Sequence, residues 1–270
     1  MGCRLFFSDA NTLCCRGKLR SGKYHIDGSV SSQFVSGLLF AAALIPGENR
    51  ITVTGKVESR PYIEMTRKAM EQFGCFSPHF SISGGHKFCS PGKINVEADW
   101  SNAAFFLAAN SLGSSITIVN LPEESLQGDR ISTELVEALL DHCVISAADI
   151  PDLIPALAIV AACNRGAVFT DIQRLRLKES DRVASTISML NNLGGQAEAT
   201  ENTLTVFGTG LTGGMVDCSD DHRIAMSAAI AATVCEKDVI LLGTECVEKS
   251  YPQFFTEYRN LGGIYEQYLR

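Results

Sequence analysis

The sequence predicts an α/β protein made of repeated, pseudo-symmetric units in which helices pack on sheets. Hydrophobic residues make up 46% and charged residues 20% of the 270 residues. That composition can build a substantial core and excludes an intrinsically disordered chain. A polar cluster, an Ala-rich helix, a short turn and a strand recur along the chain, and amphipathic helices that end near a glycine alternate with them. The first kind of segment spans 29–55, 99–121, 149–172 and 219–243, and the second spans 59–74, 127–143, 178–195 and 249–263.

The Ala-rich segments predict helices rather than strands because their small apolar residues continue for three or four turns. They have little polar surface, so we expect them to be buried. The alternating segments have one apolar face, as in the spacing of Val183, Ile187 and Leu190, and predict half-exposed helices. Their Gly-containing ends are typical helix stops. Strands are expected at Ile51–Val53, Ile116–Ile118, Leu204–Val206 and Val239–Leu242.

The repeats are compatible with a solenoid or with compact domains. Units of 50 to 70 residues with paired helices favour compact, pseudo-symmetric domains. Between residues 76 and 96 the chain becomes polar and Gly-rich, which is typical of a linker or a domain boundary. We therefore expect one domain at 1–96 and a second at 97–270.

The composition argues against several classes of function. The formal net charge of −7 disfavours sequence-independent binding to nucleic acid, which depends on Lys and Arg at the phosphates. The ten cysteines contain no C-x-x-C pair and the five histidines contain no i, i+4 pair, so we expect reduced thiols and no metal site. The uncharged stretch 28–47 contains four serines, a glutamine and a proline, and indicates a buried helix rather than a membrane span. A soluble, cytoplasmic protein is the expectation.

Polar clusters stand at the predicted helix starts, and they contain cations where the helix dipole disfavours them. Lys178, Arg182, Arg223 and Lys249 are the cations in question. The first N–H groups of a helix attract anions, so helix starts that converge with these cations would hold a multiply anionic small molecule such as a phosphate with a carboxylate. Any single Ser or Asp at such a position is more simply an N-cap, and the cluster from Lys178 to Arg182 could equally be a solvated helix start with surface ion pairs.

Seven motifs resemble those of the EPSP synthase (3-phosphoshikimate 1-carboxyvinyltransferase) family, in the order in which that family has them. The resemblance covers essentially all of residues 16–263. The motifs are DGSVSSQFVSGLLFA (27–41), ESRPYIEMT (58–66), SLQGD (125–129), IPDLIPALA (150–158), LRLKESDR (175–182), DDHRIAM (220–226) and CVEKSYPQFF (246–255).

The resemblance implies an activity and a fold. The activity is transfer of the enolpyruvyl group of phosphoenolpyruvate to the 5-hydroxyl of shikimate 3-phosphate, with release of phosphate, in chorismate and aromatic amino-acid biosynthesis. The fold is two domains of βαβαββ-type repeats that form inverse α/β barrel-like domains. No metal or organic cofactor is implied, because guanidinium and ammonium groups supply the positive charge. The implied partners are the two substrates, with no nucleic acid and no membrane.

Site residues follow from the resemblance by matching position. Asp152 matches the carboxylate that contacts the shikimate hydroxyls and accepts the proton of the 5-hydroxyl. Glu179 and Lys249 match the groups credited with proton transfer at the methylene carbon of phosphoenolpyruvate. Arg182 and Arg223, together with Lys249, match the groups that hold phosphoenolpyruvate. The residues implied to bind shikimate 3-phosphate are Ser31, Ser32, Gln33, Ser59, Tyr62 and Lys178.

The chain departs from the family at its front and between Asp129 and Asp152. Family members have a longer front that carries further cations, so we expect the first domain (1–96) to be incomplete and the chain to be inactive alone. A separate N-terminal half would then be a further partner. Between Asp129 and Asp152 the predicted surface helix (131–142) leads almost directly into the next unit, without an extra pair of strands. The role of Arg174 stays open.

Two other functions stay open on the sequence alone. One is a non-catalytic, anion-binding α/β fragment. The other is a relative of the enzymes that transfer enolpyruvyl to UDP-N-acetylglucosamine, against which LRLKESDR and SSQF argue.

Overall fold

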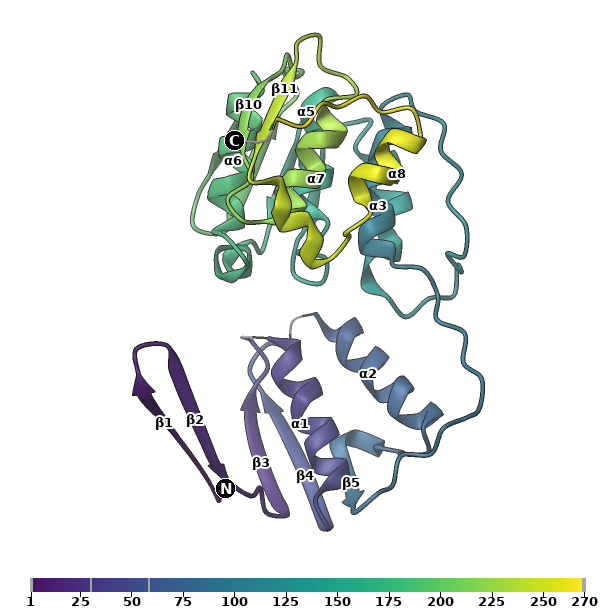
Figure 1. Cartoon of the computed structure of the whole chain (residues 1–270), viewed down its shortest axis with the longest axis vertical. Coiled ribbons are helices and arrows are strands. Elements are labelled where there is room, and N and C mark those ends of the chain that lie inside the picture. The colour runs from purple at the N-terminus through teal and green to yellow at the C-terminus, as the bar shows by residue number, and fades with distance from the viewer. Residues whose placement is uncertain (1, 30, 58, 269–270) are drawn as a thin grey trace. The chain divides into compact units, whose positions relative to one another are not determined.

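Two separate hydrophobic cores divide the chain into two units, Met1–Val96 (unit 1) and Glu97–Arg270 (unit 2). A computed structural model describes residues 2–29, 31–57 and 59–268 (Figure 1). None of the described helices combines the length and the apolar character that crossing a membrane requires.

Unit 1 is a three-stranded sheet with two helices packed on each other. β3 (Gly22–Asp27) pairs in parallel with β4 (Gly47–Thr54), and β4 pairs antiparallel with β5 (Ser81–Gly84). The helices are α1 (Ser32–Leu44) and α2 (Arg60–Gln72). Their buried side chains meet those of the sheet in one core that includes Val35, Leu39, Ile51, Ile63 and Met70.

The turn from α1 into β4 is held by the buried amide of Asn49. Its Nδ2 donates to the carbonyl oxygens of Ala42, Ile45 and Gly47, each at 3.0 Å. Its Oδ1 accepts from the N–H of Gly22 at 3.3 Å, which joins the start of β3 to the same turn. One side chain therefore satisfies backbone groups that burial would otherwise leave without partners.

Strands lie in two regions for which the sequence predicted none, the front of the chain and the segment 76–96. The front of the chain forms a hairpin of β1 (Cys3–Asp9) and β2 (Thr12–Gly17), whose side chains are largely exposed. Within the linker expected at 76–96, a 3₁₀ turn (η1, Pro78–Phe80) and β5 belong to unit 1. The segment was predicted as a linker because it is polar and Gly-rich, but its backbone pairs with β4.

Unit 2 is organised around three buried helices that pack against one another: α3 (Trp100–Ser111), α5 (Ile154–Cys163) and α7 (His222–Ala231). Every residue of α7 is buried, and so is every residue of α5 except Cys163. Small side chains let helices approach closely on all sides, which explains the Ala-rich sequences. The partly exposed helices are α4 (Ser132–Ala138), α6 (Arg182–Asn192) and α8 (Phe254–Asn260).

Two sheets pack against buried helices of unit 2, the larger against α5 and the smaller, β10-β11 in Figure 1, against α7. The larger has the order β6-β7-β9-β8, in which only β6 and β7 are parallel, and the smaller is the parallel pair β10-β11. The strands are β6 (Cys143–Ser146), β7 (Ala167–Thr170), β8 (Gln196–Ala199), β9 (Thr203–Phe207), β10 (Gly214–Asp217) and β11 (Val239–Leu242). The 3₁₀ turns are η2 (Gly128–Ile131), η3 (Gln173–Leu177) and η4 (Thr244–Lys249).

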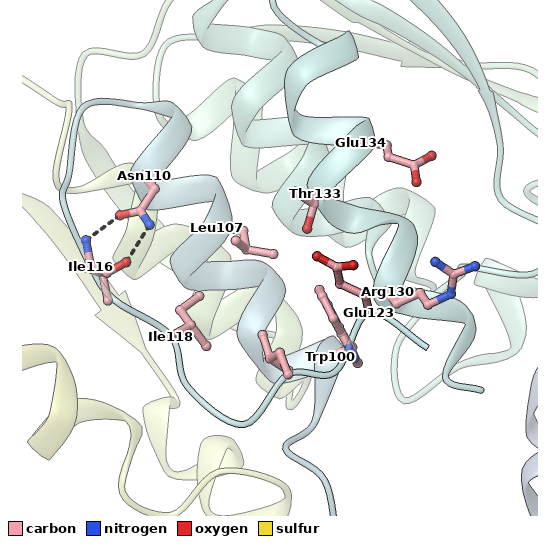
Figure 2. Close-up of a pocket in the computed structure, with 10 residues that line it drawn as sticks. Trp100, Leu107, Asn110, Ile116, Ile118, Glu123, Arg130, Thr133 and Glu134 are labelled. Atoms are coloured by element: carbon pink, nitrogen blue, oxygen red, sulfur yellow. Dashed lines mark hydrogen bonds between the residues drawn. The ribbon is translucent and has the colours of Figure 1, made fainter. Parts of the chain in front are cut away.

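The strand expected at Ile116–Ile118 is wrong, although these residues are all described. The side chain of Asn110 binds both the N–H and the carbonyl of Ile116, each at 2.8 Å, and so occupies groups that a sheet would use (Figure 2). A cavity of about 520 Å³ borders this segment, α3 and α4, with Trp100, Leu107 and Thr133 on its wall. None of the sequence-predicted site residues lines it.

Replacement of Asn49 by Ala should destabilise unit 1 and leave unit 2 unchanged. One buried and two partly buried carbonyls would lose a donor, and a buried group left unsatisfied costs about 1–3 kcal/mol. Urea unfolding followed by far-UV circular dichroism should show an earlier first transition. The fluorescence of Trp100, the only tryptophan, reports unit 2 and should keep its midpoint. Asn202→Ala, at an exposed turn, is the control and should move neither signal. An unchanged first transition in Asn49→Ala would contradict the role given to this amide.

Candidate functional site

The centre of the charged cluster in unit 2 is Arg182, the first residue of α6. Its side chain is fully buried and binds three carboxylates. Nε donates to Asp221 at 2.9 Å, Nη1 donates to Asp152 at 2.7 Å, and Nη2 donates to Glu179 at 2.5 Å. These partners hold the pKa of Arg182 above its ordinary value although burial acts in the opposite direction. A planar guanidinium with several fixed donors suits this task better than an ammonium group.

Asp152, which precedes α5, is surrounded by three cations. Besides Arg182, it binds Nζ of Lys178 at 3.2 Å and Nη2 of Arg223 at 3.3 Å. Burial would raise the pKa of Asp152, but Arg223, Lys178 and Arg182 outweigh it and hold the pKa well below the usual range. Asp152 is therefore ionised at neutral pH. It is a weak base as long as no other anion neutralises the three cations.

Glu179 joins Arg182 to the most exposed cation of the cluster. Its Oε1 lies 3.6 Å from Nζ of Lys249, whose side chain is 60% exposed. Burial would raise the pKa of Glu179, but its own backbone N–H, Arg182 and Lys249 lower it below the ordinary value. Glu179 and Lys249 thus stand next to each other at the accessible side of the cluster, where a proton could pass between them and a ligand.

Asp221 is the member of the cluster that we did not predict as a site residue. It is fully buried and caps α7 by accepting from the N–H of Arg223 at 3.0 Å. It also accepts from Ser180 Oγ at 3.0 Å and from Nη2 of Arg182 at 3.3 Å. Asp221 therefore ties the start of α6 to the start of α7. The sequence signal was its place before His222 and Arg223, where an N-cap explains an aspartate equally well.

The structure brings together all six site residues predicted in unit 2. They form one network with Asp221, in which four cations face three carboxylates. The network has one net positive charge, and the unpaired N–H groups at the starts of α6 and α7 add to the positive potential. An excess of positive charge at helix starts attracts anions. The six residues are Asp152, Lys178, Glu179, Arg182, Arg223 and Lys249.

The other five predicted residues lie at the two helix starts of unit 1. Ser31 caps α1 by accepting from the N–H of Gln33 at 3.2 Å, and Ser32 is buried. Ser59 precedes α2 in the left-handed conformation (φ 51°), and its carbonyl accepts from the N–H of Tyr62 at 3.1 Å. Both helix starts lie side by side, because Ser36 and Thr66 share a hydrogen bond of 2.7 Å near them. These five residues belong to unit 1, and the network around Arg182 belongs to unit 2.

Replacement of Asp221 by Asn should destabilise unit 2 by about 3 kcal/mol, because the buried Arg182 would lose a charged partner. The matched control is Asp141→Asn, which removes a 3.4 Å ion pair with Arg165 whose side chains are 80% and 75% exposed. That pair should contribute less than about 1 kcal/mol. Chemical unfolding followed by Trp100 fluorescence measures both. Equal effects of the two substitutions would mean that the buried network has no special role in stability.

The chain is similar to known proteins over most of its length. The family model of EPSP synthase (3-phosphoshikimate 1-carboxyvinyltransferase) matches residues 7–258. The 3-phosphoshikimate 1-carboxyvinyltransferase of Clostridium beijerinckii is 36% identical over 93% of this chain, and that of Clostridium acetobutylicum is 38% identical over 92%. The chain covers 64% and 63% of the length of these relatives.

Solved structures share the fold at lower identity. An EPSP synthase from Acinetobacter baumannii superposes with a TM-score of 0.69 at 21% identity, over 97% of this chain and 68% of that one. An enolpyruvyl transferase from Streptomyces tendae reaches 0.70 at 14% identity, over 97% of this chain and 69% of that one. These structures assign the fold class. The match of the family model and the identity to the clostridial relatives show that the chain belongs to the EPSP synthase (3-phosphoshikimate 1-carboxyvinyltransferase) family.

Proposed function

We propose that the chain carries most of a cytoplasmic carboxyvinyltransferase site, which transfers the enolpyruvyl group of phosphoenolpyruvate to the 5-hydroxyl of shikimate 3-phosphate and releases phosphate. The observation that carries the proposal is the network around Arg182, in which four cations and three carboxylates gather in unit 2. Lys249 was predicted at a helix start but ends η4, because α8 begins only at Phe254. The network offers both of the things that the reaction needs, positive charge for two anionic substrates and carboxylates for proton transfer.

The cations of the network differ in accessibility, and this suggests a division of labour. The side chain of Arg182 has no exposed surface, whereas those of Arg223, Lys178 and Lys249 are 10%, 22% and 60% exposed. We assign contact with the phosphate and carboxylate groups of the ligands to these three. Arg182 holds Asp152, Glu179 and Asp221 in place, and would need to exchange a carboxylate in order to touch phosphoenolpyruvate.

The proton transfers follow from the same arrangement. Asp152 accepts the proton of the 5-hydroxyl as the new C–O bond forms, and Glu179 with Lys249 gives a proton to the methylene carbon of phosphoenolpyruvate and takes it back as phosphate leaves. Asp152 is a weak base while three cations surround it. Anionic ligands that bind these cations would raise its pKa and make it a better base when substrate is present.

For the phosphate of shikimate 3-phosphate, we propose the helix starts of α1 and α2 in unit 1. Ser31, Ser32 and Ser59 offer hydroxyl and backbone donors there, and a helix N-terminus favours a phosphate. Gln33 and Tyr62 stand within the first turns of the same helices and would contact the ring. A separate polypeptide that supplies the remaining third of a relative's length is the further partner of this proposal.

Binding of shikimate 3-phosphate tests the proposal without requiring turnover. Titration calorimetry on the 270-residue chain should detect weak binding that Lys178→Ala reduces by roughly tenfold or more, because a charge-assisted contact contributes about 1.5–3 kcal/mol. Added salt should weaken binding further. Lys237→Ala removes an exposed lysine of unit 2 outside the network and should leave binding unchanged. Absence of binding by a chain that circular dichroism reports as folded would refute the assigned substrate site.

Turnover should require more than this chain. The 270 residues correspond to 64% of a relative, and we expect them alone to release no phosphate from the two substrates. When the unmatched part of a relative is added as a second polypeptide and activity appears, Asp152→Ala and Glu179→Ala should each lower kcat by about 10²–10⁴-fold. A coupled phosphate assay measures this. Ordinary turnover by the chain alone, or near-normal rates in either variant, would contradict the expectation. Binding without turnover under every condition would favour a non-catalytic anion-binding role.

A further inference from the structure

A further buried acidic side chain of unit 2, Asp129, is hydrogen-bonded to the start of α3. The hydroxyl of Ser101, the second residue of α3, donates a hydrogen bond to its Oδ2. The other charged groups that act on Asp129 are Asp152, which precedes α5, Arg223, the second residue of α7, and Asp99, the N-cap of α3. Asp129 itself lies in η2, which packs against α3. Two members of the network, Asp152 and Arg223, are thus close enough to Asp129 to act on its charge.

The surroundings of Asp129 do not satisfy an ionised carboxylate. The residue is 1% exposed, and its Oδ1 has no hydrogen-bond partner among the residues that the structure describes. Burial raises the pKa of Asp129 to about 6, with Asp152 and Asp99 adding to the rise while Ser101 and Arg223 oppose it. A buried carboxylate with one donor is costly, so a small change in the nearby charge decides whether Asp129 holds a proton.

We propose that Asp129 takes up a proton from solvent when an anion binds the network. The inference rests on the proposed function in that the network is the anion site. Arg223 binds Asp152 through both the side chain and the backbone carbonyl, and it is the cation that stabilises ionised Asp129. A ligand that draws on the charge of Arg223 leaves ionised Asp129 without compensation. Protonation removes that repulsion between Asp129 and the bound anion.

Other groups around Asp129 behave differently. Arg130 and Glu134, on η2 and α4, are exposed, and solvent screens their charges. His222 is buried next to Arg223, and its pKa is lowered by burial and by Arg223. Protonation of His222 would also favour an anion at low pH. The contribution of Asp129 must therefore be separated from that of His222 by substitution.

Binding of inorganic sulfate to the 270-residue chain, measured by calorimetry between pH 5.5 and 8, tests the proposal. Sulfate keeps its charge over this range, so any pH dependence belongs to the protein. The unsubstituted chain should bind roughly tenfold more tightly at pH 5.5 than at pH 8, because an ionised Asp129 repels the anion and a protonated one does not. Near pH 6.5 the heat should depend on the ionisation enthalpy of the buffer, which reports proton uptake.

Asp129→Asn should bind sulfate more tightly than the unsubstituted chain at pH 8 and equally at pH 5.5, with the buffer-dependent heat reduced. The amide keeps an acceptor for Ser101, so a purely structural role would give the opposite result or none. Asp141→Asn, at an exposed ion pair, is the control and should keep the original profile. A pH profile of Asp129→Asn parallel to that of the unsubstituted chain would overturn the proposal.

A second variant covers the case in which Asp129→Asn does not fold. Ser101→Ala removes the hydrogen bond that lowers the pKa of Asp129, so the whole sulfate profile should move to higher pH. An unmoved profile would overturn the inference, and so would absence of sulfate binding to the unsubstituted chain. If sulfate binds with proton uptake but shikimate 3-phosphate does not bind, the proposed function fails while the role of Asp129 stands.

Discussion

The charged site of unit 2 depends on the burial of one guanidinium. Arg182 lies in the interior with no exposed side-chain surface, and such a charge is costly unless carboxylates and hydrogen bonds replace water around it. Three carboxylates from three parts of the chain meet that requirement: Asp152 before α5, Glu179 before α6 and Asp221 before α7. Because each must reach Arg182, their positions relative to one another are set by the same contacts. The geometry of the site thus follows from satisfying a buried cation.

The same contacts leave cations in excess at the accessible side. Asp152 also faces Lys178 and Arg223, and Glu179 also faces Lys249. These cations, together with Arg182, lower the pKa values of both carboxylates although burial would raise them. The network is therefore positive and its carboxyl groups are ionised. Such a network attracts anions, but its carboxylates are weak bases. Ligand binding changes the charge around Asp152, and in our proposal around Asp129 as well. Binding and proton transfer are then linked through charge compensation, without any need for a large movement.

Packing explains why the site lies where it does. α3, α5 and α7 are buried on nearly all sides, so charged residues are excluded from the helix bodies and gather at the N-terminal ends. The N-terminal ends also carry unpaired N–H groups, which favour the carboxylates that cap them and the anions that bind beyond. The Ala-rich sequence and the charged cluster are two consequences of one arrangement. In unit 1 serines stand at the starts of α1 and α2, with Arg60 as the first residue of α2.

The local pattern of the chain was sufficient to predict the α/β class, the buried helices and most of the half-exposed ones. Helical periodicity and Gly-containing stops depend on near neighbours in sequence, so they can be recognised without the fold. The motifs that resemble the family also pointed to the residues that the structure joins in unit 2. The strand expected at Ile116–Ile118 failed because a side chain six residues away, Asn110, binds the backbone groups that a sheet would use. The segment 76–96 was predicted as a linker or a domain boundary, because its composition does not reveal that β5 pairs with β4.

What only the tertiary structure decided is how each polar residue is used. Arg182 and Lys249 are both cations at helix starts in the sequence, yet one is completely buried and the other is 60% exposed. Asp221 was indistinguishable from an ordinary N-cap until its contacts with Arg182 and Ser180 were in place. Asp129 carried no local sign of a raised pKa, because that shift comes from burial and from charges on other elements. Sequence by itself determined which residue types stand at the helix starts. Burial and long-range contacts decided which are structural, which can meet a ligand and which can change their protonation, because the energy of a charge depends on everything packed around it.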